Sequence, residues 1–442
     1  MDLFALILYG ATNILMVLYY QRGKSRFYQF PFWAGAIALG WFFPQAVGGY
    51  SHASDFPEGA YADGMLFASL CTLGLWAGFE LALARTTAKG SWLGASFDVG
   101  RLYYAGALLC LVGFFFQWKL WSLPEEMLAQ SQWSGATVKY LFLASVFKFG
   151  FLILWLLYLS QPKVIAPKLL VFILPCLGFL LGAAVLRGRR SEMMNLFSYL
   201  AVGLWLVRRI SVPRWVVTSL LALGLVFING IGIYRGIMKN KDVSLAERLT
   251  EAANADYLSV SKTAVEQSGA EFTNYIYYRQ VYVDLGIYDF GLSHWNKLVF
   301  NYVPGQLVGR EFKESLYYLP TGKTVAQLGE ELYGYQRRTG STNSGYKDSF
   351  GSFGWFGFIK FGLIGYIAGA LYRYAMGGHF LGQLLYLYVL TTAMQSITHG
   401  SNALLVRVWV YFFMLCYPVL FFAKVSFFRP AEGTRSKCIS SG

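Results

Sequence analysis

Long apolar segments restrict this chain more than any other feature of its sequence. Runs such as 169–186, 215–234 and 381–395 approach the length that crosses a hydrocarbon core of about 30 Å. The chain is 56% hydrophobic and only 14% charged. In lipid, only helices and closed barrels satisfy every backbone polar group, and continuous apolar runs exclude a barrel. The sequence therefore predicts an all-α polytopic membrane protein.

One hydrophilic segment, residues 235–353, interrupts the series of apolar segments. We expect transmembrane helices 1–8 within residues 1–234, a large loop domain over 235–353, helices 9–11 within 354–424 and a tail over 425–442. The eleven predicted spans are 3–20, 28–48, 64–84, 102–120, 140–160, 169–186, 193–207, 215–234, 354–372, 381–397 and 404–423.

The basic residues predict how these spans are oriented. The connections on one side, together with the tail, carry 16 lysines and arginines, whereas the short connections on the other side carry 4. By the positive-inside rule the tail is cytoplasmic, and the amino terminus and the large loop are external. The loop holds 13 basic and 13 acidic residues, so the net charge of +14 lies elsewhere and reflects topology. It requires no nucleic-acid partner.

Three arginines break this charge rule. Arg187, Arg189 and Arg190 surround one glycine at the external start of the span 193–207. Charge near the hydrocarbon is costly, which favours a functional role, and guanidinium groups suit bidentate contacts to phosphate. Further cations are predicted at the outer half or middle of the bundle, where they form a collar for a diphosphate or simply snorkel to the headgroups: Lys119, Lys148, Lys360 and Arg407.

The first half of the large loop is rich in aromatic residues. Tyrosines and tryptophans with interspersed polar residues suit a sugar-binding surface, but an amphipathic helix at the membrane interface has the same composition. Both interpretations stay open. The aromatic residues are Tyr275, Tyr277, Tyr278, Tyr282, Tyr288, Phe290, Trp295, Phe300 and Tyr302.

The second half of the loop carries candidate charged groups and small polar residues. Arg310 and Lys313 follow a Pro-Gly turn, and Lys347 and Asp348 lie in a Ser/Gly-rich stretch that leads into the ninth span. A helix start there favours anions. His294 is the one histidine in the loop, and no cysteine or histidine spacing predicts a metal site.

In order and spacing, three stretches resemble the Wzy-type oligosaccharide repeat-unit polymerases of bacterial inner membranes. They are 188–191 at the opening of a span, 302–310 with its Tyr-Val-Pro-Gly sequence, and 344–365 with its repeated glycines. The similarity covers residues 170–372. It implies a GT-C-like helical glycosyltransferase that moves an undecaprenyl (polyprenyl) diphosphate-linked glycan onto another lipid-linked repeat unit. The O-antigen and related polysaccharides of lipopolysaccharide are products of this class. The resemblance implies no cofactor, and it suggests a chain-length regulator protein as a partner.

For this reaction we expect Arg190 to stabilise the leaving diphosphate, supported by Arg187, Arg189 and Arg310. The candidate bases are Glu192, Glu311, His294 and Asp348, although Glu192 more simply orients Arg189 or Arg190. Glycan contacts are expected from Tyr302 and the aromatic stretch. The full set of predicted substrate-binding residues is Tyr302, Tyr278, Tyr282, Trp295, Lys313, Lys347, Lys360 and Arg407.

Three alternatives remain at this level. A polysaccharide ligase would use the same donor chemistry with a different acceptor. A lipid-linked glycan flippase or exporter would need cations at several depths along a path through the bundle, whereas the cations predicted here outside the cytoplasmic loops gather mainly in the outer half. A membrane scaffold for polysaccharide enzymes would not need the three arginines.

Overall fold

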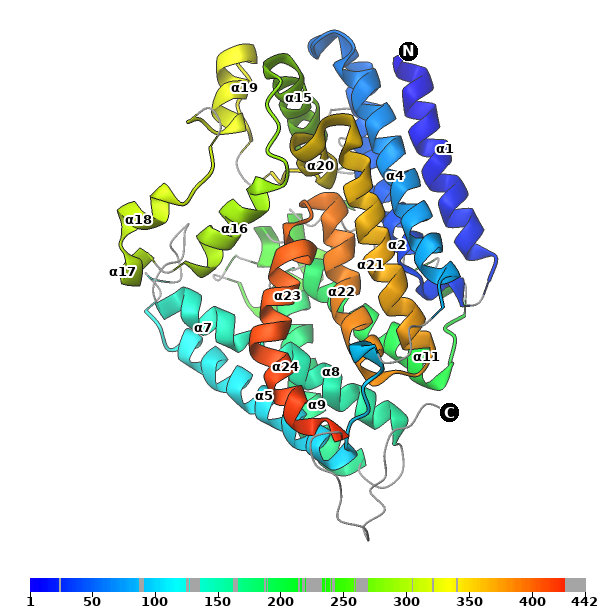
Figure 1. The fold of residues 1–442 in the computed structure, drawn as a ribbon, viewed down its shortest axis with the longest axis vertical. Coiled ribbons are helices and arrows are strands. Elements are labelled where there is room, and N and C mark those ends of the chain that lie inside the picture. The colour runs from blue at the N-terminus through cyan, green and yellow to red at the C-terminus, as the bar shows by residue number, and fades with distance from the viewer. Residues whose placement is uncertain are drawn as a thin grey trace.

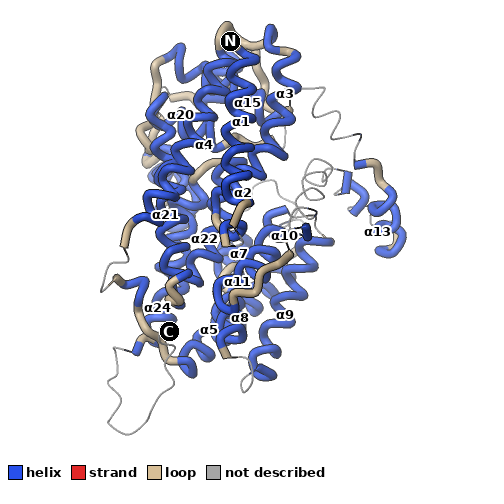
Figure 2. Tube along the Cα trace, turned by 90° about the vertical axis from the view of Figure 1, so that its right-hand side faces the viewer, coloured by secondary structure: helices blue, strands red, loops and turns tan. Residues whose placement is uncertain are grey.

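The computed structural model describes residues 1–425 apart from 24, 87–90, 125–126, 128–135, 162–165, 187, 189, 214, 217–218, 220–232, 235, 239, 241–242, 258, 260–268, 304, 320–321 and 339–340. These residues are almost all helical (Figure 2), and the extended pairing among them is limited to one bridge between Phe97 and Lys424. The helices are α1 (Asp2–Gln21), α2 (Phe30–Ile37), α3 (Phe43–Ser51), α4 (Ala60–Ala84), α5 (Val99–Trp121), α7 (Ala136–Ala144), α8 (Phe147–Ser160), α9 (Ala166–Val185), α10 (Arg190–Phe197), α11 (Gly203–Arg208), α13 (Leu245–Asn254), α15 (Ala270–Leu285), α16 (Leu292–Tyr302), α17 (Gly305–Val308), α18 (Arg310–Ser315), α19 (Val325–Tyr333), α20 (Gly345–Phe353), α21 (Phe358–Met376), α22 (Phe380–Thr398), α23 (Val408–Tyr411) and α24 (Tyr417–Ala423).

Among the described residues, nine helical stretches are long and apolar enough to cross a membrane, as expected for an all-α polytopic membrane protein. Several of them combine consecutive helices, and short π-helical segments join α2 to α3 and extend α23 at both ends. The nine stretches are Asp2–Gln21, Phe30–Ser51, Ala60–Ala84, Val99–Trp121, Thr137–Ser160, Pro167–Val185, Gly345–Met376, Phe380–Thr398 and Ala403–Ala423.

These nine correspond to nine of the eleven predicted spans, and the other two have different outcomes. The span predicted at 193–207 is helical, since α10, a π-helical segment and α11 run from Arg190 to Arg208. Its first turns are polar, which lowers the hydropathy below that of a clear spanning helix. The span predicted at 215–234 lies mostly outside the described residues.

Basic side chains gather at the end of the bundle away from the large loop. Figure 1 shows the amino terminus, α15, α19 and α20 at one end, and α24 and α9 toward the other. At that second end Arg373 donates to the carbonyls of Ala82 (2.6 Å) and Arg85 (2.7 Å). Arg209 donates to the carbonyl of Met376 (2.7 Å). These arginines thus satisfy carbonyls left without partners at helix ends.

The helices α4 and α21 approach each other backbone to backbone. A Cβ atom added to Gly78 would lie 2.0 Å from the carbonyl oxygen of Gly362, and one added to Gly365 would lie 2.1 Å from that of Leu75. Small residues spaced in this way let membrane helices pack closely, and the contact gains van der Waals energy that lipid cannot match. No residue other than glycine fits at these two positions without moving a helix.

The helix α15 fastens the large loop to this pair. The Tyr275 hydroxyl donates to the carbonyl of Gly64 (2.6 Å) on α4, and Tyr275 is fully buried. Arg279 is 1% exposed and forms an ion pair with Asp63 (2.9 Å). Its guanidinium lies over the ring of Phe350 at 4.7 Å, a cation–π arrangement that compensates for burial. The loop therefore packs on the bundle and shares its core.

Replacing Gly78 with alanine should destabilise the protein by about 1–3 kcal/mol, because the new methyl group overlaps a backbone carbonyl that cannot rotate away. The matched control is Gly178→Ala on α9, where an added Cβ meets nothing within 4 Å. We expect the control to be neutral or slightly stabilising. The midpoint of thermal unfolding in detergent, followed by size-exclusion chromatography, measures both. Equal midpoints for the two variants would contradict the close approach of α4 and α21.

Candidate functional site

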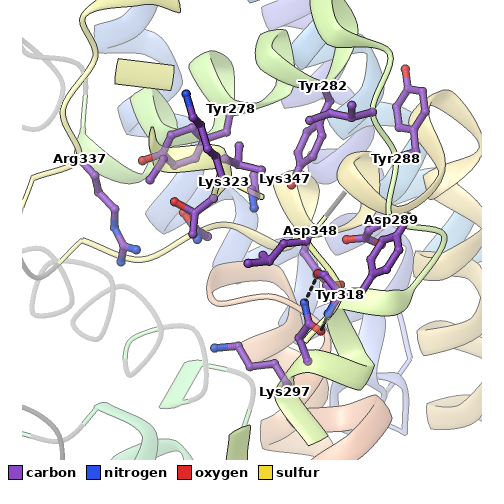
Figure 3. A pocket seen from close by; sticks show the side chains of 18 residues that line it. Tyr278, Tyr282, Tyr288, Asp289, Lys297, Tyr318, Lys323, Arg337, Lys347 and Asp348 are labelled. Atoms are coloured by element: carbon purple, nitrogen blue, oxygen red, sulfur yellow. Dashed lines mark hydrogen bonds between the residues drawn. The ribbon is translucent and has the colours of Figure 1, made fainter. Parts of the chain in front are cut away.

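A pocket of about 470 Å³ lies where the large loop meets the bundle. Its lining comes from α15, α16, α19 and α20 and from the segments between them, so both halves of the loop contribute (Figure 3). Tyrosines and cations dominate its polar surface. The lining residues are Tyr278, Tyr282, Ile287, Tyr288, Asp289, Ser293, Asn296, Lys297, Tyr318, Leu319, Lys323, Thr324, Val325, Ala326, Arg337, Asn343, Lys347 and Asp348.

The short helix α20 presents Lys347 and Asp348 to this pocket. It begins at the cap Ser344, whose hydroxyl accepts from the backbone N–H of Lys347 at 3.3 Å. The backbone at its start packs directly against α22: a Cβ atom added to Gly345 would lie 1.8 Å from the carbonyl oxygen of Ser396. Tyr346 is buried, and its hydroxyl bonds that of Tyr9 on α1 at 2.9 Å. With the helix held on its inner side, the next two residues reach the pocket.

Asp348 is held in place by three hydrogen bonds to a single oxygen. Its Oδ2 accepts from Nζ of Lys360 (3.0 Å), from the backbone N–H of Ser401 (3.0 Å) and from the Ser401 hydroxyl (2.5 Å). The side chains of Lys360 and Asp348 are 5% and 12% exposed. A cation and two N–H or O–H donors stabilise the charged carboxylate. In the described part of the chain these bonds leave Oδ1 for a ligand in the pocket.

His294 extends this network from α16. Its Nε2 lies 3.1 Å from the Ser401 hydroxyl oxygen, and its Nδ1 lies 3.3 Å from that of Ser293. Because Ser401 already donates its proton to Asp348, it must accept from His294 Nε2–H. The serine thus lies between the acid and the histidine. In a nucleophilic triad the imidazole occupies that middle place, so this arrangement does not activate Ser401.

Lys347 lies between two tyrosines of α15. Its Nζ is 5.4 Å from the ring centroid of Tyr282 and 5.8 Å from that of Tyr278. Figure 3 shows the lysine between these rings, with Arg337 on another side of the pocket. Stacking faces beside donors provide the two kinds of contact that a sugar ring makes, since tyrosine offers both an apolar body and a polar tip.

The structure brings part of the predicted site together. Four of the predicted residues line the pocket, and His294 and Lys360 contact the network behind it. In contrast, α16 to α18 direct three other predicted residues elsewhere. Those that line the pocket are Tyr278, Tyr282, Lys347 and Asp348. Of the other three, Trp295 donates to the carbonyl of Leu316 (2.9 Å) and Lys313 donates to the carbonyl of Phe300 (2.9 Å). Arg310 forms an ion pair with Glu314 (2.7 Å), and its side chain is 89% exposed.

A second group of predicted residues lies outside the pocket lining. Glu192 forms an ion pair with Lys148 (2.7 Å) and accepts from Asn195 (3.0 Å). The ring of Tyr302 packs edge-on against that of Phe142, with 6.1 Å between the ring centroids. Arg407, the remaining substrate-binding candidate, is an exposed residue at the start of the last span.

The arginine cluster is only partly described. Arg187 and Arg189 lie outside the described residues. Arg190 is the first residue of α10, and its side chain is not described. Its predicted role in holding a diphosphate therefore stays a prediction.

Sequence reasoning missed several residues of the site. Ser401 gave no signal, although it follows Gly400, which has a φ of +92° and forms the turn that directs Ser401 toward Asp348. Arg337 lies in a polar stretch without a motif. Arg279 is a lone arginine within an aromatic helix, and that isolation is the one hint of a buried role.

No family model, no curated protein and no solved structure matches this chain.

Protonation of His294 should destabilise the packing of α16 in acid. Burial first, and next the charge of Lys360, lower the pKa of His294 below its ordinary 6.5. The neutral ring therefore contributes stability that is fully present above pH 6.5 and is lost as the pH falls through the lowered pKa. We expect amide hydrogens of α16 to exchange faster at about pH 5 than at about pH 7.5, after correction for intrinsic rates.

Two controls isolate this effect. The helix α19 carries no bond to His294 and should show no such difference. The variant His294→Gln keeps a donor for Ser401 but does not titrate, so α16 should then exchange equally at both pH values. A difference that persists in this variant would exclude His294 as its source.

Proposed function

We propose that this chain is a polysaccharide polymerase, a glycosyltransferase of O-antigen or a related exopolysaccharide. It would transfer a glycan from one polyprenyl diphosphate carrier onto a repeat unit held by another. The observation that carries the proposal is the pocket where the large loop meets the bundle, which combines tyrosine faces with a fixed carboxylate. The Wzy-type resemblance of residues 170–372 supports the same class, as does the presence of Lys347, Asp348 and Lys360 in one neighbourhood.

In the proposed reaction a hydroxyl of the acceptor sugar attacks the anomeric carbon of the donor. The new C–O bond forms as the bond to the diphosphate oxygen breaks, and the polyprenyl diphosphate leaves with the bonding electrons. Oδ1 of Asp348 would accept the hydrogen bond of the attacking hydroxyl and receive its proton. The fixed cations near the pocket and the predicted arginine cluster would stabilise the growing charge of the diphosphate.

We further propose that the protein lies in a bacterial inner membrane with the pocket on the external side. The basic residues at the opposite end of the bundle, Arg85, Arg209 and Arg373 among them, support this orientation by the positive-inside rule. A GT-C-like architecture is part of the same proposal. No metal is needed for the chemistry described, since the proposed charge stabilisation comes from arginine and lysine.

A gel of polysaccharide from cells that lack the gene tests the proposed function. Without the protein we expect single capped repeat units, and with the wild type a ladder of long chains. Asp348→Asn and Arg190→Ala should reduce long polymer by about 100-fold or more, because each removes a group that acts in the transition state. The matched control is Asp284→Asn, an exposed carboxylate of α15 that bonds Gln280 (2.7 Å) outside the pocket. It should restore the ladder.

The variants are compared at equal protein level and equal unfolding midpoint, since Asp348→Asn leaves Lys360 without its carboxylate. Long polymer that persists in the deletion strain would contradict the polymerase. Polymer that is left unattached to its final acceptor would indicate a ligase, and polymer in the wrong compartment would indicate an exporter.

A further inference from the structure

The pocket carries an excess of positive charge. Its lining contains four cations and two carboxylates, the cations being Lys297, Lys323, Arg337 and Lys347 and the carboxylates Asp289 and Asp348. Both carboxylates already have partners inside the protein. Asp348 is bound by Lys360 and Ser401, and Asp289 accepts from the backbone N–H of Gly291 at 2.7 Å. The pocket therefore offers cations to a ligand, and the negative charge that it contains is largely engaged.

The four cations differ in how fully the protein satisfies them. Lys323 is paired with Glu331 (2.7 Å), and Arg337 donates to the carbonyl of Ser341. Lys297 lies over the ring of Phe300, with Nζ 5.7 Å from the ring centroid. Lys347 is partly buried, and its ammonium faces the rings of Tyr278 and Tyr282. Among the described residues no carboxylate forms an ion pair with it. Asp348 and Asp289 offset its charge through space, together with the Tyr282 side chain. A partly buried ammonium with no carboxylate in direct contact can still take a carboxylate or phosphate of a ligand as its partner.

Two neutral groups in the pocket also lack partners. Tyr278 is 2% exposed, yet its hydroxyl has no hydrogen-bond partner in the described part of the chain. The Oδ1 atom of Asn343 is buried and equally without a partner there. Buried polar groups are almost always bonded, so exceptions need an explanation. A ligand that enters the pocket with donors and acceptors of its own provides it.

We propose that the pocket binds an acidic sugar residue, one that carries a carboxylate or phosphate substituent, with Lys347 as its counter-ion. Tyr278 and Tyr282 flank that lysine, and Arg337 lies across the pocket as a second cation (Figure 3). The sugar ring would contact the tyrosine faces while its hydroxyls bond Tyr278 and Asn343. The inference rests on the proposed function, because it names the chemical class of the glycan that this polymerase would extend.

Binding to the purified full-length protein in detergent tests the inference by isothermal titration calorimetry. The probes are trigalacturonate as an acidic trisaccharide, maltotriose as a neutral one, and inorganic pyrophosphate as a stand-in for the carrier diphosphate. We expect the wild type to bind trigalacturonate roughly tenfold more tightly than maltotriose, with a preference that falls as salt is raised. Lys347→Gln should remove the preference, and Lys347→Arg should retain it.

The matched control is Arg338→Gln, an exposed arginine of the same loop that lies outside the pocket lining. It should bind like the wild type. Equal affinity of the wild type for both trisaccharides, or a preference that survives Lys347→Gln, would overturn the inference. Lys347-dependent binding of pyrophosphate without binding of trigalacturonate would also overturn it, because the cation would then serve the carrier.

Failure of the inference and failure of the proposed function give different results. Maltotriose that binds as tightly as trigalacturonate, together with an intact requirement for the gene in the polymer ladder, leaves a polymerase of neutral glycans. Lys347-dependent binding of trigalacturonate with long polymer still present in the deletion strain leaves an acidic-glycan site on a protein of another function.

Discussion

The close backbone contact between α4 and α21 determines the positions of the two walls of the pocket, the tyrosines of α15 on one side and Asp348 of α20 on the other. Gly78 and Gly365 let the two helices meet without intervening side chains. The end of α21 nearest the large loop carries Lys360, which fixes Asp348. The corresponding end of α4 carries Asp63, which fixes α15 through Arg279. Each wall thus takes its position from one member of a single helix pair. A shift of α4 against α21 would move the tyrosines relative to the carboxylate.

The chemistry of the pocket depends on how its charges are paired. Asp348 is fixed by Lys360 and Ser401, so it can bind a hydroxyl without moving. Lys347, the preceding residue of α20, lies near two tyrosine rings and forms no ion pair with an acid among the described residues. Two adjacent residues of opposite charge therefore face the pocket in different states: Asp348 is in a direct ion pair, whereas the charge of Lys347 is offset only through space and by Tyr282. Asp348 is therefore suited to the proposed role of base, and Lys347 to the proposed role of counter-ion for a charged ligand.

The sequence predicts the helical bundle well, because hydropathy depends on local composition, and nine of the predicted spans correspond to spanning helices. It also selects Lys347 and Asp348, which lie directly before a span. It does not predict which face of α15 is buried, since tyrosines lie on several faces; Tyr275 enters the core, whereas Tyr278 and Tyr282 reach the pocket. Ser401 and Arg337 come to the site through contacts distant in sequence, which no local pattern encodes.

The bond between Tyr9 and Tyr346 joins residues 337 positions apart. During synthesis the first helix leaves the ribosome long before α20 exists, and Ser401 comes later still. Each helix can enter the membrane as it emerges, since insertion depends on its own hydrophobicity, but the pocket requires contacts of high sequence separation. Insertion and site formation are consequently separate events. A chain cut short after α20 would keep most of its membrane helices and still lack the serine that orients Asp348.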